Sequence, residues 1–329
     1  MKQVVLGNER AWLEDAPDPE PSGEWIVVRM TRTPICGSDM YAFRARETIY
    51  GGGHEGVGEV VAVDGARHRR PGDRVALNGS SGCGTCQSCL AGDYILCTAK
   101  PPFSGHFQHY VRIQEWLCMP LPADISWDLG ALMGCGLCPA FEALKRLGVT
   151  AFSTVLVTGL GPVGLGAVAL AKFLNARVIA ADVEPWRRQR AEEIGADVVL
   201  DAAAEGVLAA VRDLTEGRGV PAAVDCSGNP AAERLALDAL APRGRLAFVG
   251  ENLGTIEVSP SNDLIRRDVE IHGAWHFNLN DAHHLVTFLR RFPQAGKLIS
   301  HTFGFTQVQE AFDTFASRQA AKVLLDPWS

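Results

Sequence analysis

The chain has 329 residues, of which 47% are hydrophobic and 21% are charged, a balance typical of a globular protein with room for two domains. Its formal net charge of -7 at pH 7 and the absence of a block of Lys or Arg argue against a surface dedicated to nucleic acid or to an anionic membrane. No apolar run approaches the roughly 18 residues of a membrane span, and the first residues do not form a signal peptide, so we expect a cytoplasmic protein.

The first third of the chain favours a β-rich domain. Short extended segments separated by turns stand at residues 25–32, 57–63 and 74–77. The Pro-Leu-Pro sequence at 120–122 marks a joint, and the spacing then predicts a helix over 127–146, interrupted by Gly134, Gly136 and Pro139.

From residue 153 onward, strand and helix patterns alternate. Strands are predicted at 155–158, 177–181, 198–200, 222–225 and 245–249, and helices at 162–174, 185–194, 207–215 and 230–240. Such a succession predicts an α/β domain with a parallel sheet wrapped by helices. The alternation stops after 269–275, and the tail predicts helices near 281–291 and 307–315 and a strand at 322–325.

A glycine-rich turn follows the first of these strands. Gly159, Gly161 and Gly164, with Pro162 and Val163 between the last two, have the G-x-G-x-x-G spacing of a strand-to-helix turn that cradles a pyrophosphate at a helix N-terminus. Asp182 ends the next strand, about 20 residues further on, where the acidic ribose ligand of an NAD site belongs. The alternative is a glycine turn that binds no nucleotide.

The nine cysteines are odd in number and closely spaced, which favours metal binding over disulfides in a reducing compartment. Four of them have the spacing C-x2-C-x2-C-x7-C: Cys83, Cys86, Cys89 and Cys97. Four thiolates complete a tetrahedral zinc and leave no open position, so the pattern predicts a structural zinc site. An iron–sulfur cluster or four unrelated thiols are the alternatives.

A second constellation combines Cys36 with His54, which lie in separate turns. A thiolate and an imidazole can hold zinc and leave room for water or substrate, but a third protein ligand is required from elsewhere in the chain. Taken alone, Cys36 is equally well read as an inert buried thiol and His54 as a hydrogen-bonded core histidine.

Together these motifs resemble the zinc-dependent medium-chain alcohol dehydrogenases, in the branch of sorbitol, threonine and other polyol dehydrogenases. The resemblance spans nearly the whole chain and rests on the segments at 36–39, 53–55, 71–75, 134–136 and 225–228, besides the four-cysteine lobe and the glycine turn with Asp182. It implies an α/β protein with a GroES-like β-rich catalytic domain (1–135, with the zinc lobe at about 79–100), a Rossmann domain with a doubly wound parallel sheet (136–275) and a return to the catalytic domain (276–329).

The resemblance also assigns residues to the catalytic zinc. Its ligands become Cys36, His54 and Cys135, whereas Cys138 matches the family position less well. Glu55 corresponds to a carboxylate beside the zinc that can replace a ligand during exchange, and Asp39 to the partner that orients His54.

Ser38 takes the family position of the hydroxyl that accepts the proton of the substrate. The chain departs from the family at Tyr41, where many relatives carry a histidine, and at His106 and His109, where relatives carry small and acidic residues. We expect these two histidines to lie on the surface. Aromatic residues close to the motifs are candidate pocket walls: Phe43, Phe103, Trp116 and Trp275.

The implied activity is hydride transfer between a secondary alcohol and NAD, with two zinc ions per chain and the alcohol oxygen polarised by the catalytic zinc. Asp182 favours NAD over NADP, although Arg187 and Arg188 can offset its negative charge. We include Arg187 in the predicted cofactor site. The expected substrate is a polyol, cyclitol or sugar-like alcohol, and a homodimer or homotetramer is expected. The alternatives are a zinc-independent quinone or enoyl reductase and a non-catalytic dinucleotide-binding redox sensor.

Overall fold

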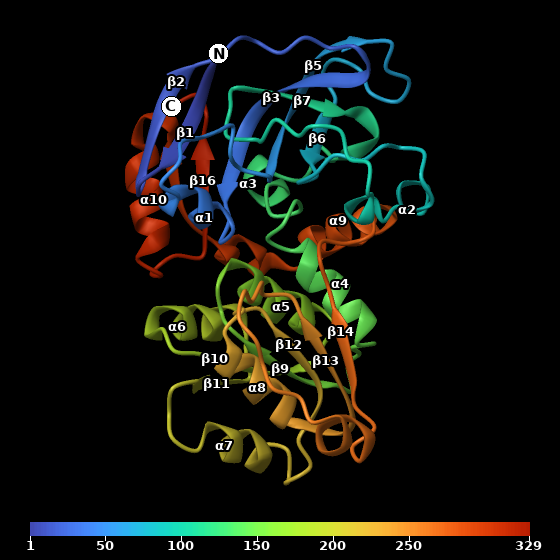
Figure 1. Ribbon diagram of the computed structural model, residues 1–329, viewed down its shortest axis with the longest axis vertical. Coiled ribbons are helices and arrows are strands. Elements are labelled where there is room, and N and C mark those ends of the chain that lie inside the picture. Colours follow the sequence, from blue (N-terminus) through green and yellow to red (C-terminus); the bar gives the residue numbers. More distant parts are fainter. The chain divides into compact units, whose positions relative to one another are not determined.

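The structure is a computed structural model that describes all residues from 1 to 329, and the chain divides into two compact units. The first unit combines Met1–Cys138 with Phe277–Ser329, and the second is Pro139–His276. The tail of the chain therefore returns to the unit in which the chain begins (Figure 1).

Two sheets build the first unit. A three-stranded sheet has the order β2-β1-β4, and a larger sheet has the order β15-β16-β3-β5-β6-β8, with β7 also paired to β3. The strands are β1 (Lys2–Gly7), β2 (Arg10–Asp15), β3 (Gly23–Ile35), β4 (Ile49–Tyr50), β5 (Gly56–Asp64), β6 (Arg74–Leu77), β7 (Tyr110–Gln114), β8 (Cys118–Pro120), β15 (Ile299–Gly304) and β16 (Lys322–Asp326). Because β16 pairs antiparallel with β3, the tail becomes an integral strand of this sheet.

The helices of the first unit are short. They are α1 (Asp39–Arg44), α2 (Gln87–Leu90), α3 (Trp127–Gly130), α9 (Ala282–Arg291) and α10 (Val308–Ala316), with the 3-10 turns η1 (Tyr94–Leu96), η2 (Glu115–Leu117), η4 (Leu279–Asp281), η5 (Pro293–Leu298) and η6 (Phe305–Gln307). α10 closes one apolar core, in which Phe312 stacks on Phe43 with ring centroids 5.1 Å apart and meets Phe107 edge-on at 5.9 Å.

The helix predicted over 127–146 is two helices. α3 ends at Gly130, a run of turns follows, and α4 (Cys138–Arg146) begins where Pro139 can occupy the first turn without losing a hydrogen bond. The turns contain the glycines that interrupt the sequence pattern, and they also carry Cys135.

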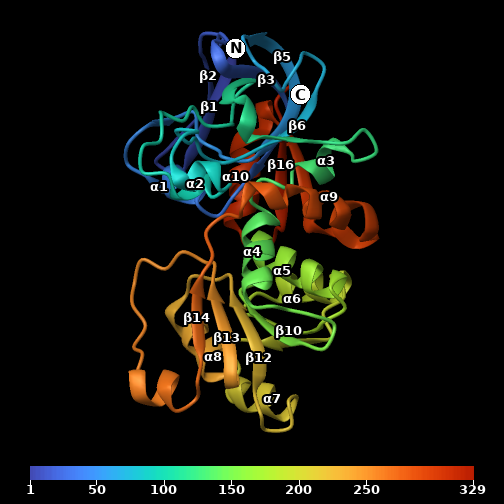
Figure 2. The ribbon, with the colours of Figure 1, turned by 90° about the vertical axis from the view of Figure 1, so that its right-hand side faces the viewer.

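The second unit is a six-stranded parallel sheet with the order β11-β10-β9-β12-β13-β14 (Figures 1 and 2). Its strands are β9 (Thr154–Thr158), β10 (Arg177–Asp182), β11 (Val198–Asp201), β12 (Val220–Asp225), β13 (Leu240–Phe248) and β14 (Glu270–Gly273). Numbered within the unit, the order is 3-2-1-4-5-6, that of a dinucleotide-binding doubly wound sheet. The expected GroES-like and Rossmann architecture is therefore confirmed.

The helices that connect these strands are α5 (Pro162–Phe173), α6 (Pro185–Ile194), α7 (Val207–Asp213) and α8 (Pro230–Asp238), and a π-helical turn, η3 (Pro260–Ile265), precedes β14. Three of them begin with proline, which has the backbone angle of a helix and needs no partner for a missing N–H. Leu240, predicted in the last helix, instead begins β13, because α8 ends two residues earlier.

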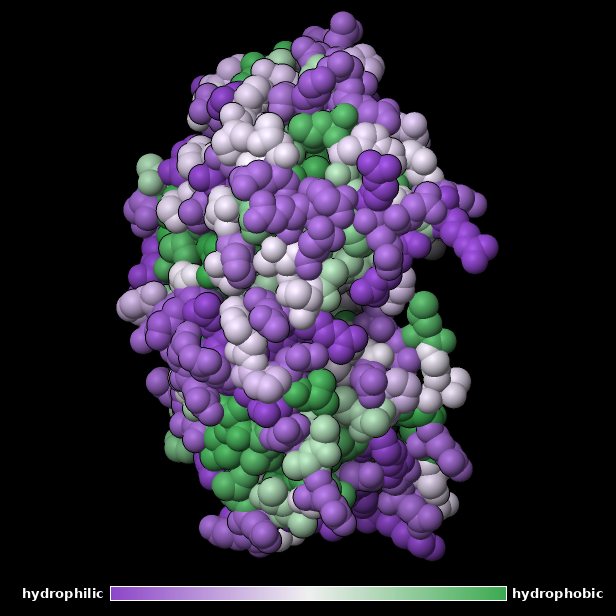
Figure 3. Space-filling model, turned by 90° about the vertical axis from the view of Figure 1, so that its left-hand side faces the viewer, coloured by the Kyte–Doolittle hydropathy of each residue, from purple (hydrophilic) through white to green (hydrophobic).

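No helix combines the length and apolar composition that crossing a membrane requires. The face of the molecule in Figure 3 is largely hydrophilic, with hydrophobic side chains gathered in small groups between the polar ones.

Candidate functional site

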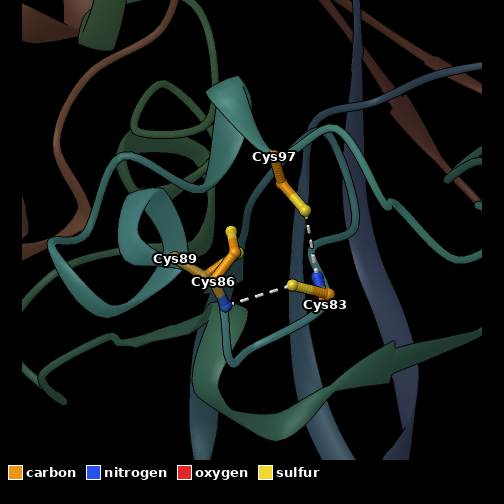
Figure 4. Close-up of side chains that lie close together, drawn as sticks. All are labelled: Cys83, Cys86, Cys89 and Cys97. Carbon is orange, nitrogen blue, oxygen red and sulfur yellow. Dashed lines mark hydrogen bonds between the residues drawn. The ribbon is translucent and has the colours of Figure 1, made fainter.

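The four closely spaced cysteines form one cluster. The Sγ atoms of Cys83, Cys86, Cys89 and Cys97 all lie within 4.8 Å of one another. Cys86 caps α2, Cys89 lies in α2, and Cys97 follows η1, so two short helical turns bring the sulfur atoms together (Figure 4). A zinc–sulfur distance of about 2.3 Å separates the sulfurs of a tetrahedral site by about 3.8 Å, which this cluster can match.

Hydrogen bonds in the cluster favour thiolates. The N–H of Cys86 donates to the Sγ of Cys83 at 3.3 Å, and the N–H of Cys83 donates to the Sγ of Cys97 at 3.3 Å. The backbone donors of Thr85 and Cys86 lower the pKa of the Cys83 thiol to about 6. Burial and the neighbouring sulfurs raise the pKa of Cys89 to about 12. Four thiolates this close therefore require a cation, and zinc fits the donor set.

A second group lies within the first unit. Ligand atoms of Cys36, His54, Glu55 and Cys135 also lie within 4.8 Å of one another. Cys36 follows β3, His54 and Glu55 precede β5, and Cys135 lies in the turns before α4. The Sγ atoms of Cys36 and Cys135 are 3.7 Å apart, close to the separation of two zinc-bound sulfurs.

Asp39 joins the two loops of this group. One carboxylate oxygen accepts a hydrogen bond from the N–H of Cys36 at 2.7 Å, and the other lies 3.5 Å from Nδ1 of His54. This arrangement leaves Nε2 of His54 for the group of sulfurs. Gly53, at φ +80°, permits the close approach, since a Cβ there would lie 2.6 Å from the ring of Phe107.

Electrostatics distinguish the two sulfurs. The hydrogen bond from Cys135 and the positive charges of Lys322 and His54 hold the pKa of Cys36 well below its usual value, against the effect of burial. The hydrogen bond to Cys36 and burial raise the pKa of Cys135 well above its usual value. A metal cation would remove this asymmetry by stabilising both thiolates.

Glu55 is fully buried and forms an ion pair with Lys322, which is 1% exposed. Burial raises the pKa of Glu55 to about 8, although Lys322 opposes the shift. Its Oε1 pairs with Lys322 and lies 3.8 Å from Nε2 of His54, whereas its Oε2 has no hydrogen-bond partner. The local sequence predicts only a strand at Lys322 and gives no sign of this ion pair, because the pair connects residues 267 positions apart.

Three further residues considered for the catalytic site are outside the ligand group. Ser38 is exposed at the start of α1 and its hydroxyl makes no capping hydrogen bond, and Tyr41 is 55% exposed. Cys138 is outside the group, and its thiol donates to the carbonyl of Gly134 at 3.1 Å.

The aromatic residues predicted as pocket walls lie in different parts of the structure. Phe43 is a core residue of the α10 cluster, so its assignment as a pocket wall is wrong. Trp116 packs beside the four-cysteine lobe, near Gly82. Trp275 belongs to the second unit and is 55% exposed. Phe103 contacts His106, with ring centroids 5.1 Å apart.

The expectation that His106 lies on the surface is wrong. Its side chain is completely buried, and burial together with the charge of His54 lowers the pKa of His106 to about 3, while the Glu55 backbone partly opposes the shift. His109 is half-buried, and its ring stacks on Trp328 with centroids 4.3 Å apart.

The glycine turn of the second unit fits a dinucleotide. Close packing requires glycine at two positions of the turn. A Cβ on Gly159, which has φ +80°, would collide with Ser227, and a Cβ on Gly164 would collide with the carbonyl of Gly159. Gly161 is different: a Cβ there would meet only Nη1 of Arg187, at 3.9 Å. It caps α5, whose first N–H groups receive no side-chain cap and can therefore bind a phosphate, and Val163 supplies one of them.

Asp182 lies at the end of β10, beside this turn. Its carboxylate accepts hydrogen bonds from the N–H of Leu160 at 2.5 Å and from that of Glu184 at 2.8 Å, and Nη1 of Arg187 is 4.0 Å away. Arg188 instead donates to the carbonyls of Asp182 and Val183. Arg187 is thus the cation that faces both Gly161 and Asp182.

Both units match known families. Residues 22–123 match the alcohol dehydrogenase GroES-like domain, and residues 162–291 match the zinc-binding dehydrogenase family. The chain is 30% identical to an L-threonine 3-dehydrogenase of Alteromonas mediterranea, with 99% of each chain covered. It is 32% identical to the sorbitol dehydrogenase of Bacillus subtilis, with 76% of this chain and 75% of that one covered.

Among solved structures, the alcohol dehydrogenase TADH from Thermus sp. ATN1 superposes with a TM-score of 0.92 at 27% identity, with 99% of each chain covered. This chain thus combines a GroES-like domain, a doubly wound sheet and two groups of metal-ligating side chains. The chain belongs to the zinc-type medium-chain alcohol dehydrogenases, in the branch of the sorbitol and threonine dehydrogenases.

Proposed function

We propose that this protein oxidises a polyol, cyclitol or sugar-like secondary alcohol with NAD, or reduces the corresponding ketone. The observation that carries the proposal is the buried group of Cys36, His54, Glu55 and Cys135, on the same chain as a phosphate-binding glycine turn that ends beside Asp182. A zinc-independent quinone or enoyl reductase does not need this ligand group, and turnover of a secondary alcohol with NAD would exclude a non-catalytic redox sensor.

Each side chain has a proposed role. Cys36, His54 and Cys135 hold the catalytic zinc, and Cys83, Cys86, Cys89 and Cys97 hold the structural zinc. The catalytic zinc supplies Lewis acidity that makes an alcohol more acidic, and NAD supplies the hydride acceptor. Asp39 orients His54, Glu55 is the reserve ligand, and Ser38 takes the proton from the substrate hydroxyl.

The substrate class is supported by the relatives. By their names, they act on sorbitol and on threonine, in which a secondary alcohol has a polar neighbour on the next carbon. A panel of polyols, cyclitols, sugars, amino alcohols and simple alcohols, assayed with NAD, tests the proposal. Strong preference for ethanol or a long-chain aliphatic alcohol would contradict the substrate class, and no oxidation of any alcohol would contradict the enzyme.

Further proposals concern the setting of the enzyme. None of the nine cysteines is in a disulfide, as suits the cytoplasm, where we expect the protein to act. A homodimer or homotetramer is proposed from the family. Sedimentation at several protein concentrations would contradict this proposal if it gave only the mass of one chain, 35.4 kDa.

We expect NAD to be preferred over NADP. The Asp182 carboxylate can accept hydrogen bonds from ribose hydroxyls but repels a 2′-phosphate. Asp182→Ser should therefore raise the ratio of kcat/KM for NADP to that for NAD by about 10-fold or more, which corresponds to removal of one like-charge contact. Arg187→Gln is the matched test of the neighbouring cation, and it should lower affinity for both cofactors. Equal use of the two cofactors by the wild type would contradict the role of Asp182.

We expect Ser38→Ala to lower kcat by about 10²-fold, the usual effect of losing a positioned proton-transfer group, with zinc content unchanged. Tyr41→Phe should change kcat far less, since Tyr41 is 55% exposed and is outside the ligand group. Steady-state kinetics with metal analysis of both variants provide the measurement. Equal losses in the two variants, or a loss in Ser38→Ala that follows loss of zinc, would refute the proposed proton path.

A further inference from the structure

His106 is a buried polar side chain that the reaction outlined above does not use. Its side chain is 0% exposed, and neither Nδ1 nor Nε2 makes a hydrogen bond of ordinary geometry, although the backbone of Glu55 lies close enough to the ring to oppose the lowering of its pKa. A buried polar atom without a partner costs about 1–3 kcal/mol, and packing alone does not require an imidazole at such a position.

The ring is fixed beside the catalytic ligand group. The N–H of His106 donates to the carbonyls of Gly52 and Gly53, at 3.0 and 3.1 Å, in the loop that leads directly into His54. The charge of His54 and the backbone of Glu55 both act on the His106 imidazole. His106 is nevertheless outside the metal-ligand group, so its nitrogens are not needed to hold the metal.

The two loops are joined by backbone contacts of residues 105–107, and the side chain of His106 takes no part in them. Gly105, at φ +72°, lies so close to the backbone of Gly51 that no side chain fits, and Phe107 packs under Gly53. The backbone of this segment therefore positions a buried imidazole whose ring nitrogens make no hydrogen bond of ordinary geometry. The ring also contacts Phe103, which is 38% exposed, so one side chain connects the buried imidazole with the surface.

We propose that His106 determines specificity by hydrogen bonding to a second hydroxyl of the substrate, on the carbon next to the reacting carbinol. The inference rests on the proposed function and narrows it to alcohols with two adjacent hydroxyl groups. A neutral imidazole offers one N–H donor and one acceptor nitrogen, and a hydroxyl group can serve either of them. A substrate without the second hydroxyl leaves the buried ring unsatisfied and loses this interaction.

Matched substrate pairs test the proposal in the zinc-loaded enzyme with NAD. The pairs are 2,3-butanediol with 2-butanol and trans-1,2-cyclohexanediol with cyclohexanol, in which only the adjacent hydroxyl differs. We expect His106→Leu to lower kcat/KM for the diols by about 10-fold, the scale of one hydrogen bond, and to leave the mono-alcohols within about 3-fold. His106→Gln, which keeps a donor and an acceptor, should recover most of the diol preference.

His109→Leu is the matched control, because it makes the same change three residues away, in a ring that stacks on Trp328. It should leave the diol preference unchanged. Equal losses on both members of each pair in His106→Leu, or an unchanged diol preference, would overturn the inference and assign His106 a structural role.

Failure of the proposed function is separable from failure of the inference. The change in Tm of the NADH complex on addition of each compound measures binding without turnover. If no alcohol is oxidised, the proposed function fails, but greater stabilisation by diols that disappears in His106→Leu would still support the inference. If the wild type neither oxidises diols in preference nor binds them in preference to the mono-alcohols, the inference is wrong.

Discussion

Cys135→Ala is expected to lower zinc content from two equivalents per chain to one and to reduce kcat/KM by at least about 10³-fold. Zinc is lost because the catalytic group keeps too few ligands to retain its metal. Activity falls because the Lewis acid stabilises the charge of the transition state by several kcal/mol. The structural cluster should keep its zinc, since its four sulfurs form a separate group in the chain. Elemental analysis and steady-state kinetics on the same preparation measure both effects.

Cys138→Ala is the matched control for this experiment. Cys138 lies three residues further along the same segment and is equally buried, but its thiol donates to the carbonyl of Gly134 and it is not in the ligand group. We expect two equivalents of zinc and kcat/KM within about 3-fold of the wild type, with a stability loss of about 1–2 kcal/mol from the small cavity. If Cys138→Ala loses the metal and Cys135→Ala keeps it, the two cysteines have been assigned the wrong way round.

Sites whose residues are close together in the chain are predictable from the sequence. The four-cysteine lobe lies within 15 consecutive residues, from Cys83 to Cys97, so spacing alone indicates a common metal. The glycine turn likewise needs only a strand, a turn and a helix in sequence, and β9 and α5 provide them. Both patterns are local, and local patterns can be read without knowing the fold.

The catalytic group needed more than spacing. Its ligands come from three separate segments, and only the family resemblance favours Cys135 over Cys138, which lies three residues further along the chain. The predicted helix over 127–146 would have placed both cysteines on a helix. The turns that replace its middle instead bring the Sγ of Cys135 to 3.7 Å from that of Cys36.

His106 and Lys322 could not be placed from their local sequence. His106 lies in a polar stretch typical of a surface loop, yet its backbone bonds to Gly52 and Gly53, far earlier in the chain, and this draws the ring inside. Lys322 occupies an apolar strand, and it reaches Glu55 because β16 pairs with β3, which in turn pairs with β5. Burial of a charge therefore depended on sheet topology, which hydrophobic periodicity does not specify.

Lys322→Met is expected to lower the free energy of unfolding by about 3–5 kcal/mol, the usual cost of leaving one member of a buried ion pair unpaired. Methionine has nearly the length and volume of lysine without its charge, so packing changes little. The decrease in the free energy of unfolding therefore measures the electrostatic effect of leaving Glu55 without its cation. Both partners are at most 1% exposed, so water cannot replace the lost cation. Urea unfolding of the zinc-loaded protein, with metal content recorded, provides the measurement.

A double-mutant cycle separates the ion pair from other effects of the substitution. Glu55→Gln removes the carboxylate charge, so Lys322→Met combined with Glu55→Gln should be more stable than Lys322→Met alone, because no uncompensated charge remains buried. Lys322→Arg, which keeps the charge, should cost less than Lys322→Met. If the two single substitutions add without coupling, the ion pair does not stabilise this site, and Glu55 must be neutralised by the metal instead of by Lys322.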